Sequence, residues 1–494
     1  MSIFENKKIR LTVKSPIHIG SVEQKITRFE FIHQGQYIYP VSEDRLSVFL
    51  QKKNLISSYV TAVEREGNRF SLADLFKNKG VSLKVEDLEA LSHNRKIKPL
   101  SDASQMQDFK PVIRDGFGIP YIPGTSIKGV IRTALLYNML KAFKDTNPAG
   151  FKTTVENRII KDVANKVNKK WLSQWANEKW LEGFVLEGKS KSPNTDWLRM
   201  LHISDAYSSN NIETLLIPAN ILKKENIWAY KKENSGQNTA IWVECIPENT
   251  AFEFEAAWDK KLLEDFERHN TNILLPSNLG GIFDNVNKWS QDVFDFEKQF
   301  SKEHALDKWY KNNQSSFRIG FGSGMIATTI AMLLDENLRK KVRNYAGLNR
   351  GNDIAPKSRR IWLKNNNAVP FGWAVIEVLP FDIKNIYTST SASPVINSKE
   401  QETKIVDTKI VTKESKTNEL IPETITWENA TLTWSPGNQT LRASKDNLKA
   451  EIKISDRNFV PANYHEILFE KRKSFTANIT VEKIGNAFKI IKIT

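Results

Sequence analysis

Cysteine is almost absent from this chain of 494 residues, which contains Cys245 alone. A single cysteine excludes an internal disulfide and a zinc cluster with cysteine ligands, and it fits a reducing compartment. Long apolar runs are missing too, since the longest, residues 325–334, is too short to span a bilayer. Residues 1–10 are polar and lack the apolar core of a signal peptide. These absences predict a soluble, cytoplasmic protein.

Acidic residues are fewer than basic residues in this chain. Lysine and arginine total 72 against 57 aspartates and glutamates, which gives a formal net charge of +15. An excess of this size favours a polyanionic partner such as nucleic acid over an anionic membrane surface. We therefore expect a nucleic-acid partner and no membrane.

A proline-glycine turn leads into an amphipathic helix at Gly124. The apolar face of this helix consists of Ile127, Val130, Ile131, Ala134 and Leu135. Gly124 lets the backbone bend into the helix, and the hydroxyl of Thr125 or Ser126 can cap the first turn. Lys128 and Arg132 are four residues apart and share one side of the helix. Amides, hydroxyls and cations at one helix start predict a phosphate-binding site.

Three glycines follow Arg318 at a spacing of two, and the segment contains Gly320, Gly322, Ser323 and Gly324. Glycines let a backbone approach a phosphate or a base closely, and Arg318 adds positive charge. No Gly-Lys-Ser/Thr sequence follows, so this segment is not a nucleotide-binding phosphate loop. A tight strand-to-helix connection explains the pattern equally well. The residues alone leave both interpretations open.

Lys357, Arg359 and Arg360 form a dense basic run before a predicted strand. Most basic runs are solvated surface. This one follows the glycine-rich segment and precedes Trp362, which favours a clamp on a nucleic-acid backbone.

His18 is the one histidine with a tempting position for acid–base cleavage of RNA. It lies between two isoleucines, where a hydrogen-bonded structural histidine is more common, so we expect no catalytic role. His202 and Asp205 are three apart on a predicted strand, which places them on opposite faces and excludes a shared metal. We expect Asp205 to anchor a strand end.

Asp102, Asp108 and Asp115 are interpreted as solvated loop acids. No residue set has the spacing of a paired acid and base, a metal cage or an activated nucleophile. We therefore expect a protein that is not an enzyme and that uses no metal and no cofactor.

Strand and helix patterns predict an α+β protein in four parts. Residues 1–198 contain strand–strand–helix units typical of a ferredoxin-like (RRM-like) sheet, with helical insertions that include most of residues 55–100. Residues 199–385 form a second α/β half that contains the glycine-rich segment. Residues 386–424 are rich in Ser, Thr, Lys and Glu and predict a flexible linker. Short alternating strands in residues 425–494 predict a small β-barrel-like module.

Four segments, in order along the first three quarters of the chain, are similar to RAMP-superfamily subunits of CRISPR effector complexes. They are Leu11–Gly20, Pro123–Gly129, Met200–Asp205 and Arg318–Met325. The resemblance is greatest to the fifth-subunit family of the type III-A (Csm) complex. It implies two ferredoxin-like RAMP domains with helical insertions, and it does not extend to the C-terminal module.

The resemblance implies a non-catalytic subunit that holds guide RNA (crRNA) between its RAMP domains. Such a subunit caps the filament of backbone subunits at the crRNA 3′ end and supports crRNA maturation and complex assembly in antiviral defence. The resemblance also implies that the glycine-rich loop lies against guide RNA. The helix start, the basic run and His18 are the other expected contacts, and we expect binding without preference for sequence. Implied partners are crRNA, target single-stranded RNA through the complex, the backbone RAMP subunit, the small subunit and a host trimming nuclease.

Two other functions stay open. One is a RAMP endoribonuclease that processes precursor crRNA, with His18 as acid or base. The other is a structural RAMP subunit of a type III-B (Cmr) or III-D complex. The large signalling subunit is not expected, because neither a His-Asp dipeptide nor a Gly-Gly-Asp-Asp sequence occurs.

Overall fold

The computed structural model describes residues 3–380 and 424–493. Within these ranges it leaves out residues 23–24, 68–69, 105, 170–173, 191–192, 225–227, 233, 235, 237–239, 272, 303–305, 315–316, 349–353, 436–439, 447, 454–458, 471–473 and 485–486. The chain divides into two compact units, Met1–Ala392 and Ser393–Thr494. The predicted linker, residues 386–424, lies outside the described residues except for Thr424.

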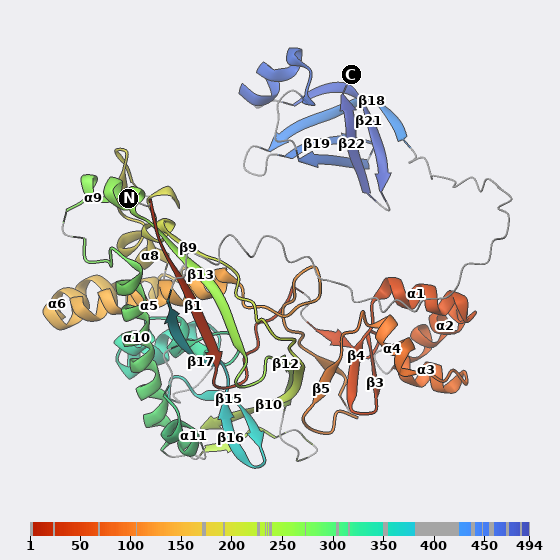
Figure 1. Ribbon diagram of the computed structural model, residues 1–494. Helices are drawn as coiled ribbons and strands as arrows, with labels where there is room; N and C mark the ends of the chain where they lie inside the picture. The colour runs from red at the N-terminus through yellow and green to blue at the C-terminus, as the bar shows by residue number, and fades with distance from the viewer. Residues whose placement is uncertain are drawn as a thin grey trace, which may run out of the picture. The chain divides into compact units, whose positions relative to one another are not determined.

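The first unit is built around a five-stranded antiparallel sheet (Figure 1). The strand order is β14 (Phe317–Arg318), β17 (Trp373–Leu379), β1 (Phe4–Val13), β13 (Ala251–Asp259) and β9 (Leu201–Ile203). In β1, buried Ile9, Leu11 and Val13 alternate with more exposed residues, as expected for a sheet covered on one face. The long helices α5 (Gly124–Thr146) and α10 (Leu279–Ser301) contribute to the same hydrophobic core.

Six of these elements follow one another along the chain as β1, α5, β9, β13, α10 and β17. Their strands lie in the order β17-β1-β13-β9 with every neighbour antiparallel, which is the ferredoxin-like arrangement. The sequence predicts two such domains divided at residue 198. The described strands instead form one, with β1 and α5 from the first predicted half and the other elements from the second. Pairing between distant strands leaves no local signal in a sequence, which explains the difference.

Insertions into three connections of this domain build a second, eight-stranded sheet. Its order is β16 (Asn367–Pro370), β15 (Ser358–Lys364), β10 (Thr214–Lys224), β5 (Ile97–Pro99), β4 (Tyr37–Pro40) and β3 (Phe31–Gln34), and β11 (Trp228–Tyr230) and β12 (Ala240–Cys245) pair with β10. β3, β4 and β5 come from between β1 and α5, β10 to β12 from between β9 and β13, and β15 and β16 from between α10 and β17. Three distant segments therefore meet in one sheet.

Four helices gather around β3 and β4 with a small hydrophobic core of their own (Figure 1). They are α1 (Glu43–Lys52), α2 (Ile56–Glu66), α3 (Leu72–Asn78) and α4 (Val85–Leu91), and the last three confirm the helical insertion predicted there. The remaining named helices are α6 (Pro148–Phe151), α7 (Asn157–Ala164), α8 (Gln174–Trp180), α9 (Lys260–His269), α11 (Asp307–Asn312), α12 (Gly324–Thr328) and α13 (Glu336–Tyr345). Two short ladders join β2 (Ile26–Thr27) to β6 (Asp108–Phe109) and β7 (Val185–Leu186) to β8 (Lys189–Ser190). Over the described ranges, none of the helices has the length and apolar character of a membrane span.

The second unit is a closed barrel of five strands. In order around the barrel they are β18 (Thr424–Ser435), β19 (Thr440–Lys445), β20 (Leu448–Lys453), β22 (Ala487–Ile493) and β21 (Phe475–Ile484). Leu432, Leu441, Ile479 and Ile490 are fully buried and belong to a separate hydrophobic core. The unit therefore has an interior of its own.

Candidate nucleic-acid interface

The start of α5 is docked on the segment that follows β9. The amide of Gly124 donates to the Asp205 carboxylate at 2.7 Å, so Asp205 is the anchor that the sequence predicts. A Cβ at Gly124 would lie 2.5 Å from a carbonyl oxygen at the end of β9, so glycine is required by close packing. The N-cap residue is Pro123, so the prediction of a cap by Thr125 or Ser126 is wrong. Both lie inside the first turn because the helix already begins at Gly124.

Lys128 and Arg132, the two predicted cations of this helix start, have partners within the protein. The Nζ of Lys128 donates to the carbonyl oxygen of Leu201 at 2.7 Å, and burial lowers the pKa of this lysine. Arg132 pairs with Asp196 and, at 3.6 Å, with Glu182. Both cations hold α5 against neighbouring segments of the same protein. They would therefore affect ligand binding only indirectly, by fixing the position of the helix.

The glycine-rich loop packs against the loop that carries His18. The amide of Phe321 donates to the carbonyl oxygen of His18 at 2.8 Å, and the two rings meet edge to face with centroids 5.7 Å apart. Ser323 is buried and donates its hydroxyl to the carbonyl oxygen of Gly320 at 2.8 Å. Hydrogen bonds within and between the loops therefore fix the loop's shape.

The three glycines of this loop have different surroundings. Gly320 has a φ of +77°, and a Cβ there would lie 2.4 Å from the His18 carbonyl oxygen. Gly322 has a φ of +88°, and its Cβ would lie 2.9 Å from the Cβ of Phe371. Gly324 has a φ of +61°, and in the described structure no atom lies within 4 Å of its Cβ position. Packing requires the first two glycines, whereas Gly324 leaves the backbone open to a ligand.

Arg318 and Arg359 share one buried carboxylate, that of Glu297. Their nitrogens lie 3.6 Å and 2.7 Å from its oxygens, and the two arginines are only 2% and 7% exposed. Arg318 also donates to the carbonyl oxygen of Gly322 at 2.8 Å and lies over the ring of Trp373. These guanidinium groups hold the glycine-rich loop from inside the protein.

The other two residues of the predicted basic run are less buried. Arg360 is half-buried and burial lowers its pKa. Its Nη1 has no hydrogen-bond partner among the described residues. Lys357 is half-buried as well and comes just before β15. Arg360 therefore keeps one buried nitrogen that could donate to a ligand.

His18 is buried between the glycine-rich loop and β12, and it makes hydrogen bonds to both. It is 4% exposed, and its Nδ1 lies 2.7 Å from the carbonyl oxygen of Glu244. A carbonyl oxygen only accepts, so Nδ1 carries the hydrogen. Burial is the main reason why the pKa of His18 is lowered. The histidine is therefore a neutral, hydrogen-bonded group of the interior.

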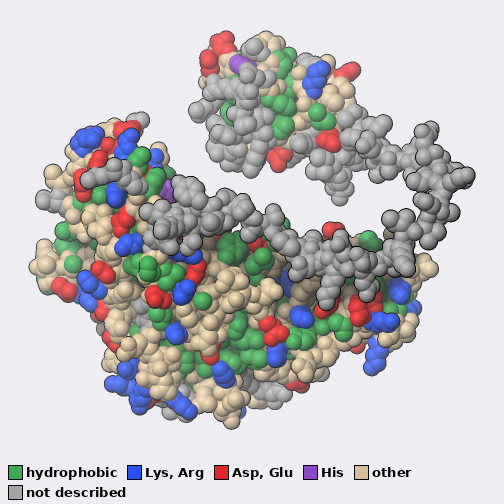
Figure 2. Space-filling model, viewed as in Figure 1, with side chains coloured by type: hydrophobic (Ala, Val, Ile, Leu, Met, Phe, Trp, Pro, Cys, Tyr) green, Lys and Arg blue, Asp and Glu red, His purple; other side chains and the backbone are tan. Residues whose placement is uncertain are grey.

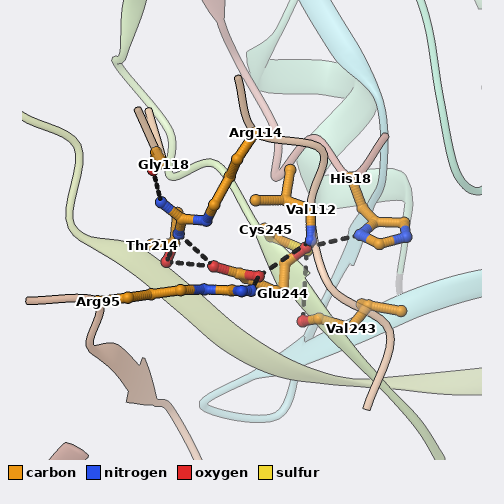
Figure 3. Close-up of polar contacts among 9 residues, drawn as sticks. All are labelled: His18, Arg95, Val112, Arg114, Gly118, Thr214, Val243, Glu244 and Cys245. Carbon is orange, nitrogen blue, oxygen red and sulfur yellow. Dashed lines mark hydrogen bonds and ion pairs between the residues drawn. The ribbon is translucent and has the colours of Figure 1, made fainter. Parts of the chain in front are cut away.

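Glu244 on β12 is the centre of a buried polar cluster that no sequence pattern indicates (Figure 3). Its carboxylate accepts from Arg114 at 2.5 Å, Arg95 at 2.7 Å, the Thr214 hydroxyl at 2.7 Å and the Val112 amide at 3.0 Å. Burial by itself would raise the pKa of Glu244, but the two arginines hold it at about 2. The charged carboxylate thereby fixes the segment that leads to α5.

Arg114 also begins a tight, exposed turn. Its Nη1 donates to the carbonyl oxygen of Gly118 at 2.7 Å. The Asp115 carboxylate accepts from the amides of Phe117 and Ile119, both at 2.9 Å. Phe117 is 92% exposed at the tip of this turn. A rigid turn thus presents an aromatic ring to solvent.

A second aromatic group lies between this turn and α5. The rings of Tyr121 and Tyr207 stack with centroids 5.6 Å apart at an interplanar angle of 14°, and Tyr207 is 40% exposed. Ile122 and Ala206 exchange backbone hydrogen bonds beside them. Tyr207 and Phe117 are absent from our sequence-based candidates, because a single aromatic residue in a loop has no pattern.

Backbone hydrogen bonds join these loops into one surface, which we call the loop strip. It consists of residues 15–21, 111–126, 204–207 and 320–324. Its exposed members are Gly20, Thr125, Tyr207, Gly320, Gly324, residues 116–119 and residues 204–205. Aromatic rings stack on bases, and first-turn amides of a helix bind phosphate where they are free. In α5 the Gly124 amide donates to Asp205 and the Ser126 amide donates to the carbonyl oxygen of Pro123. Figure 2 shows Lys and Arg mixed with Asp and Glu on one face of the described chain, so the positive charge is dispersed there.

One sequence match to a phosphate loop is excluded by its conformation. Residues 183–190 read Gly-Phe-Val-Leu-Glu-Gly-Lys-Ser. The structure places β7, a turn at Glu187 and Gly188 with φ of +51° and +72°, and β8 in this segment. A phosphate loop requires a helix to begin at its Lys-Ser, so this hairpin provides no nucleotide site.

The three acids predicted in loops take part in local contacts, and one of them, Asp108, lies on β6 and not in a loop. Asp108 pairs with Lys25 at 2.9 Å, and the Asp102 carboxylate accepts from the amide of Ser104 at 2.9 Å. Across the residues that the structure describes, no three His, Cys, Asp or Glu side chains come together as a metal site.

Comparison with known proteins defines the class. The chain matches the RAMP superfamily over residues 10–324, well over half of its length. It therefore belongs to the RAMP superfamily. The matched range contains every part of the loop strip.

The relatives within this class are CRISPR proteins, and they confirm the resemblance to type III-A (Csm) subunits. The chain is 25% identical to the CRISPR-system protein Csm5 of Streptococcus thermophilus, over 68% of this chain and 82% of the relative. It is 24% identical to Csm5 of Methanocaldococcus jannaschii, over 74% of this chain and 87% of the relative. The resemblance to the fifth subunit is therefore confirmed from sequence.

Two solved structures share the fold. One is a chain in the cryo-electron microscopy structure of a Csm–crRNA–target RNA ternary complex of a type III-A system. It has a TM-score of 0.54 and 22% identity, and the match covers 76% of this chain and 100% of that one. The other is the crystal structure of Csm5 from T. onnurineus, with a TM-score of 0.50, 18% identity and coverage of 74% and 99%.

Proposed function

We propose that this chain is a non-catalytic crRNA-binding subunit of a type III-A effector. In this proposal it caps the filament of backbone subunits at the crRNA 3′ end and supports crRNA maturation and assembly. Its partners are crRNA, the backbone and small subunits, target single-stranded RNA through the complex and a host trimming nuclease. The observation that carries the proposal is the loop strip, which lies entirely within the RAMP match and joins the predicted helix start, glycine-rich loop and His18 loop.

The predicted RNA-binding residues take two roles in this proposal. The exposed backbone at Gly320 and Gly324 and the first turn of α5 at Thr125 and Ser126 contact the sugar-phosphate chain. Phe117 stacks on a base, a mode that accepts any sequence.

The buried members act as positioning residues. Ser323 and Gly322 shape the glycine-rich loop, Arg318 and Arg359 support it through Glu297, and His18 holds it to the neighbouring loop. Gly124, Lys128 and Arg132 fasten the start of α5 in the same way. Arg360 on β15 and Lys357 just before it are assigned to a phosphate of the RNA backbone.

The endoribonuclease alternative depends on His18. A general acid or base must reach the substrate, and this ring is 4% exposed with Nδ1 already bonded. His18→Ala should therefore leave target-RNA cleavage by the assembled complex unchanged while lowering the stability of the subunit. Metal-free cleavage of repeat RNA by the purified chain, lost in His18→Ala at unchanged fold, would establish the enzyme instead.

A binding titration tests the proposal directly. Labelled single-stranded RNA is titrated with the first unit, residues 1–392, at about 50 and about 200 mM salt. Phosphate contacts predict that affinity falls at least about tenfold between the two conditions. Matching affinities for RNAs of unrelated sequence are expected as well. An affinity independent of salt would contradict a phosphate-binding surface.

The remaining alternative is a structural RAMP subunit of a type III-B or III-D complex. Co-expression with the type III-A subunits distinguishes the two, because the proposal predicts that this chain co-purifies with the backbone subunit and crRNA. Failure to join that complex, with normal RNA binding, would favour the alternative.

A further inference from the structure

The strands of the C-terminal barrel have a distinctive connectivity. In chain order they are β18, β19, β20, β21 and β22, and around the barrel they lie first, second, third, fifth, fourth. The third and fifth pair in parallel, and the other neighbours are antiparallel. Short helical turns at residues 462–464 and 466–470 lie between the third and fourth strands. A five-stranded Greek-key barrel with this order is an OB-fold.

We infer that this barrel is an OB-fold module that binds single-stranded nucleic acid on the outer face of β19 and β20. OB-folds bind ligands across their second and third strands, which are β19 and β20 in this barrel. Arg442 and Ser444 are exposed on β19 and alternate with the buried Leu441 and Ala443. The outer face is therefore polar where an OB-fold receives its ligand.

Charge identifies the ligand as a polyanion. Residues 424–494 contain eleven lysines and arginines against seven aspartates and glutamates. Two of the lysines lie on β20 at positions in register with this face, because Lys449 is opposite Ser444 and Lys453 is opposite Thr440. An excess of cations on two adjacent strands suits a sugar-phosphate chain.

Arg442 is a cation in the middle of the outer face of β19 and β20. It pairs with Glu451 on β20 at 3.4 Å, and the two side chains are 57% and 66% exposed. An ion pair this exposed contributes little to stability, so its arginine can be given up to a phosphate at low cost. Thr433, opposite Arg442 on β18, is exposed and adds a hydroxyl to the same row.

A single strand fits better than a duplex. OB-folds hold an extended strand of about 4–16 nucleotides along a basic groove, whereas a duplex presents a wider and stiffer surface. The barrel lies outside the RAMP match, which ends at residue 324. Nucleic-acid binding by the barrel would therefore be an activity of its own, separate from that of the loop strip.

The isolated barrel, residues 424–494, can be tested because it has its own core. Fluorescence anisotropy with a labelled RNA of about 12 nucleotides, within OB-fold site sizes, should show saturable binding that weakens with salt. Arg442→Glu should weaken it at least about tenfold, as should Ser444→Glu, a second variant on the same face. The same RNA annealed into a duplex should bind less tightly.

Lys492→Glu is the matched control, since it makes the same charge change at an exposed position of β22 that pairs with β21. It should change the affinity less than about threefold, and melting curves should show that all variants fold. Absence of oligonucleotide binding would overturn the inference, as would equal losses in Arg442→Glu and Lys492→Glu or tighter binding of the duplex. Binding by residues 1–392 is measured separately, so either proposal can fail alone.

Discussion

At the scale of single residues, Glu244 organises the candidate interface. Its carboxylate holds the segment ahead of α5 through Arg114 and Val112, and its backbone carbonyl holds His18. The sequence contains only an isolated acid in an apolar strand here, and its partners Arg95 and Arg114 are distant along the chain. Long-range pairing of this kind has no local pattern, which is why the sequence predicts His18 and the helix start but not the group that joins them.

Glu244→Gln should destabilise the first unit by about 3 kcal/mol, because two half-buried arginines lose their shared, fully buried carboxylate. Urea unfolding of residues 1–392 gives the free-energy difference. Glu253→Gln is the control, since Glu253 pairs with Lys8 and Arg10 on the surface and its loss should cost less than about 1 kcal/mol. Equal costs for the two variants would show that the buried cluster is not a source of stability.

The same carboxylate predicts a dependence on pH. The pKa of Glu244 is lowered to about 2 in the folded protein from an ordinary value of 4.5. Its contribution is therefore complete above the ordinary value and is lost as pH falls from about 4.5 towards 2. Unfolding free energies measured over this range should fall more steeply for the wild type than for Glu244→Gln. Parallel pH profiles would contradict this assignment.

Two glycines of one loop should respond differently to alanine. Both Gly320 and Gly324 have positive φ, which costs an alanine about 1–2 kcal/mol. At Gly320 the new methyl group would also collide with the His18 carbonyl oxygen. Thermal melting should therefore show the larger loss for Gly320→Ala. A similar small loss for both would mean that the two loops are not packed as the structure has them.

At the scale of elements, α5 shows what a sequence reveals and what it leaves open. Its apolar face is confirmed, since Ile127, Ile131, Ala134 and Leu135 are buried. The spacing of Lys128 and Arg132 correctly places both on one side of the helix. It does not reveal that the carbonyl of Leu201 and the carboxylate of Asp196 lie against that side. Helical periodicity is local, whereas these partners come from β9 and the segment just before it, more than sixty residues away.

The exposed turn should contribute to RNA binding and not to stability. Phe117→Ala removes a ring that is 92% exposed, so the unfolding free energy should change by less than about 0.5 kcal/mol. RNA affinity should fall by about 1–3 kcal/mol, the usual value of one stacked base. Leu274→Ala, at a residue 78% exposed outside the loop strip, should change neither quantity. Unchanged affinity in Phe117→Ala would exclude the turn from the interface.

At the scale of the whole molecule, the order of elements is visible in the sequence, but the assignment of strands to sheets is not. The second predicted half begins at residue 199, and the strands β9, β10, β12 and β13 follow there. Two of these, β9 and β13, complete a sheet begun by β1, and β10 and β12 enter the second sheet. Alternation marks a strand and its buried face, while its neighbours depend on contacts between segments hundreds of residues apart.

The composition of residues 386–424 predicts a flexible linker that proteases can cut between the two compact units. Limited proteolysis should cut first within this segment and release two stable fragments, one for each compact unit. Mass spectrometry of the fragments locates the cuts. Deletion of residues 393–494 should leave residues 1–392 folded and able to join the effector complex. Early cleavage inside the first unit, or failure of the shortened chain to assemble, would show that the barrel is integral to it.

The central claim is that the loop strip holds crRNA, and crosslinking tests it most directly. A complex reconstituted with crRNA that carries photoreactive uridines near the 3′ end is irradiated, digested and analysed by mass spectrometry. We predict crosslinks in residues 111–126, 204–207 and 320–324, with Phe117 and Tyr207 among the sites. Crosslinks in the first unit confined to α1–α4 or to the open face of β1 and β13, with none in the loop strip, would contradict the account.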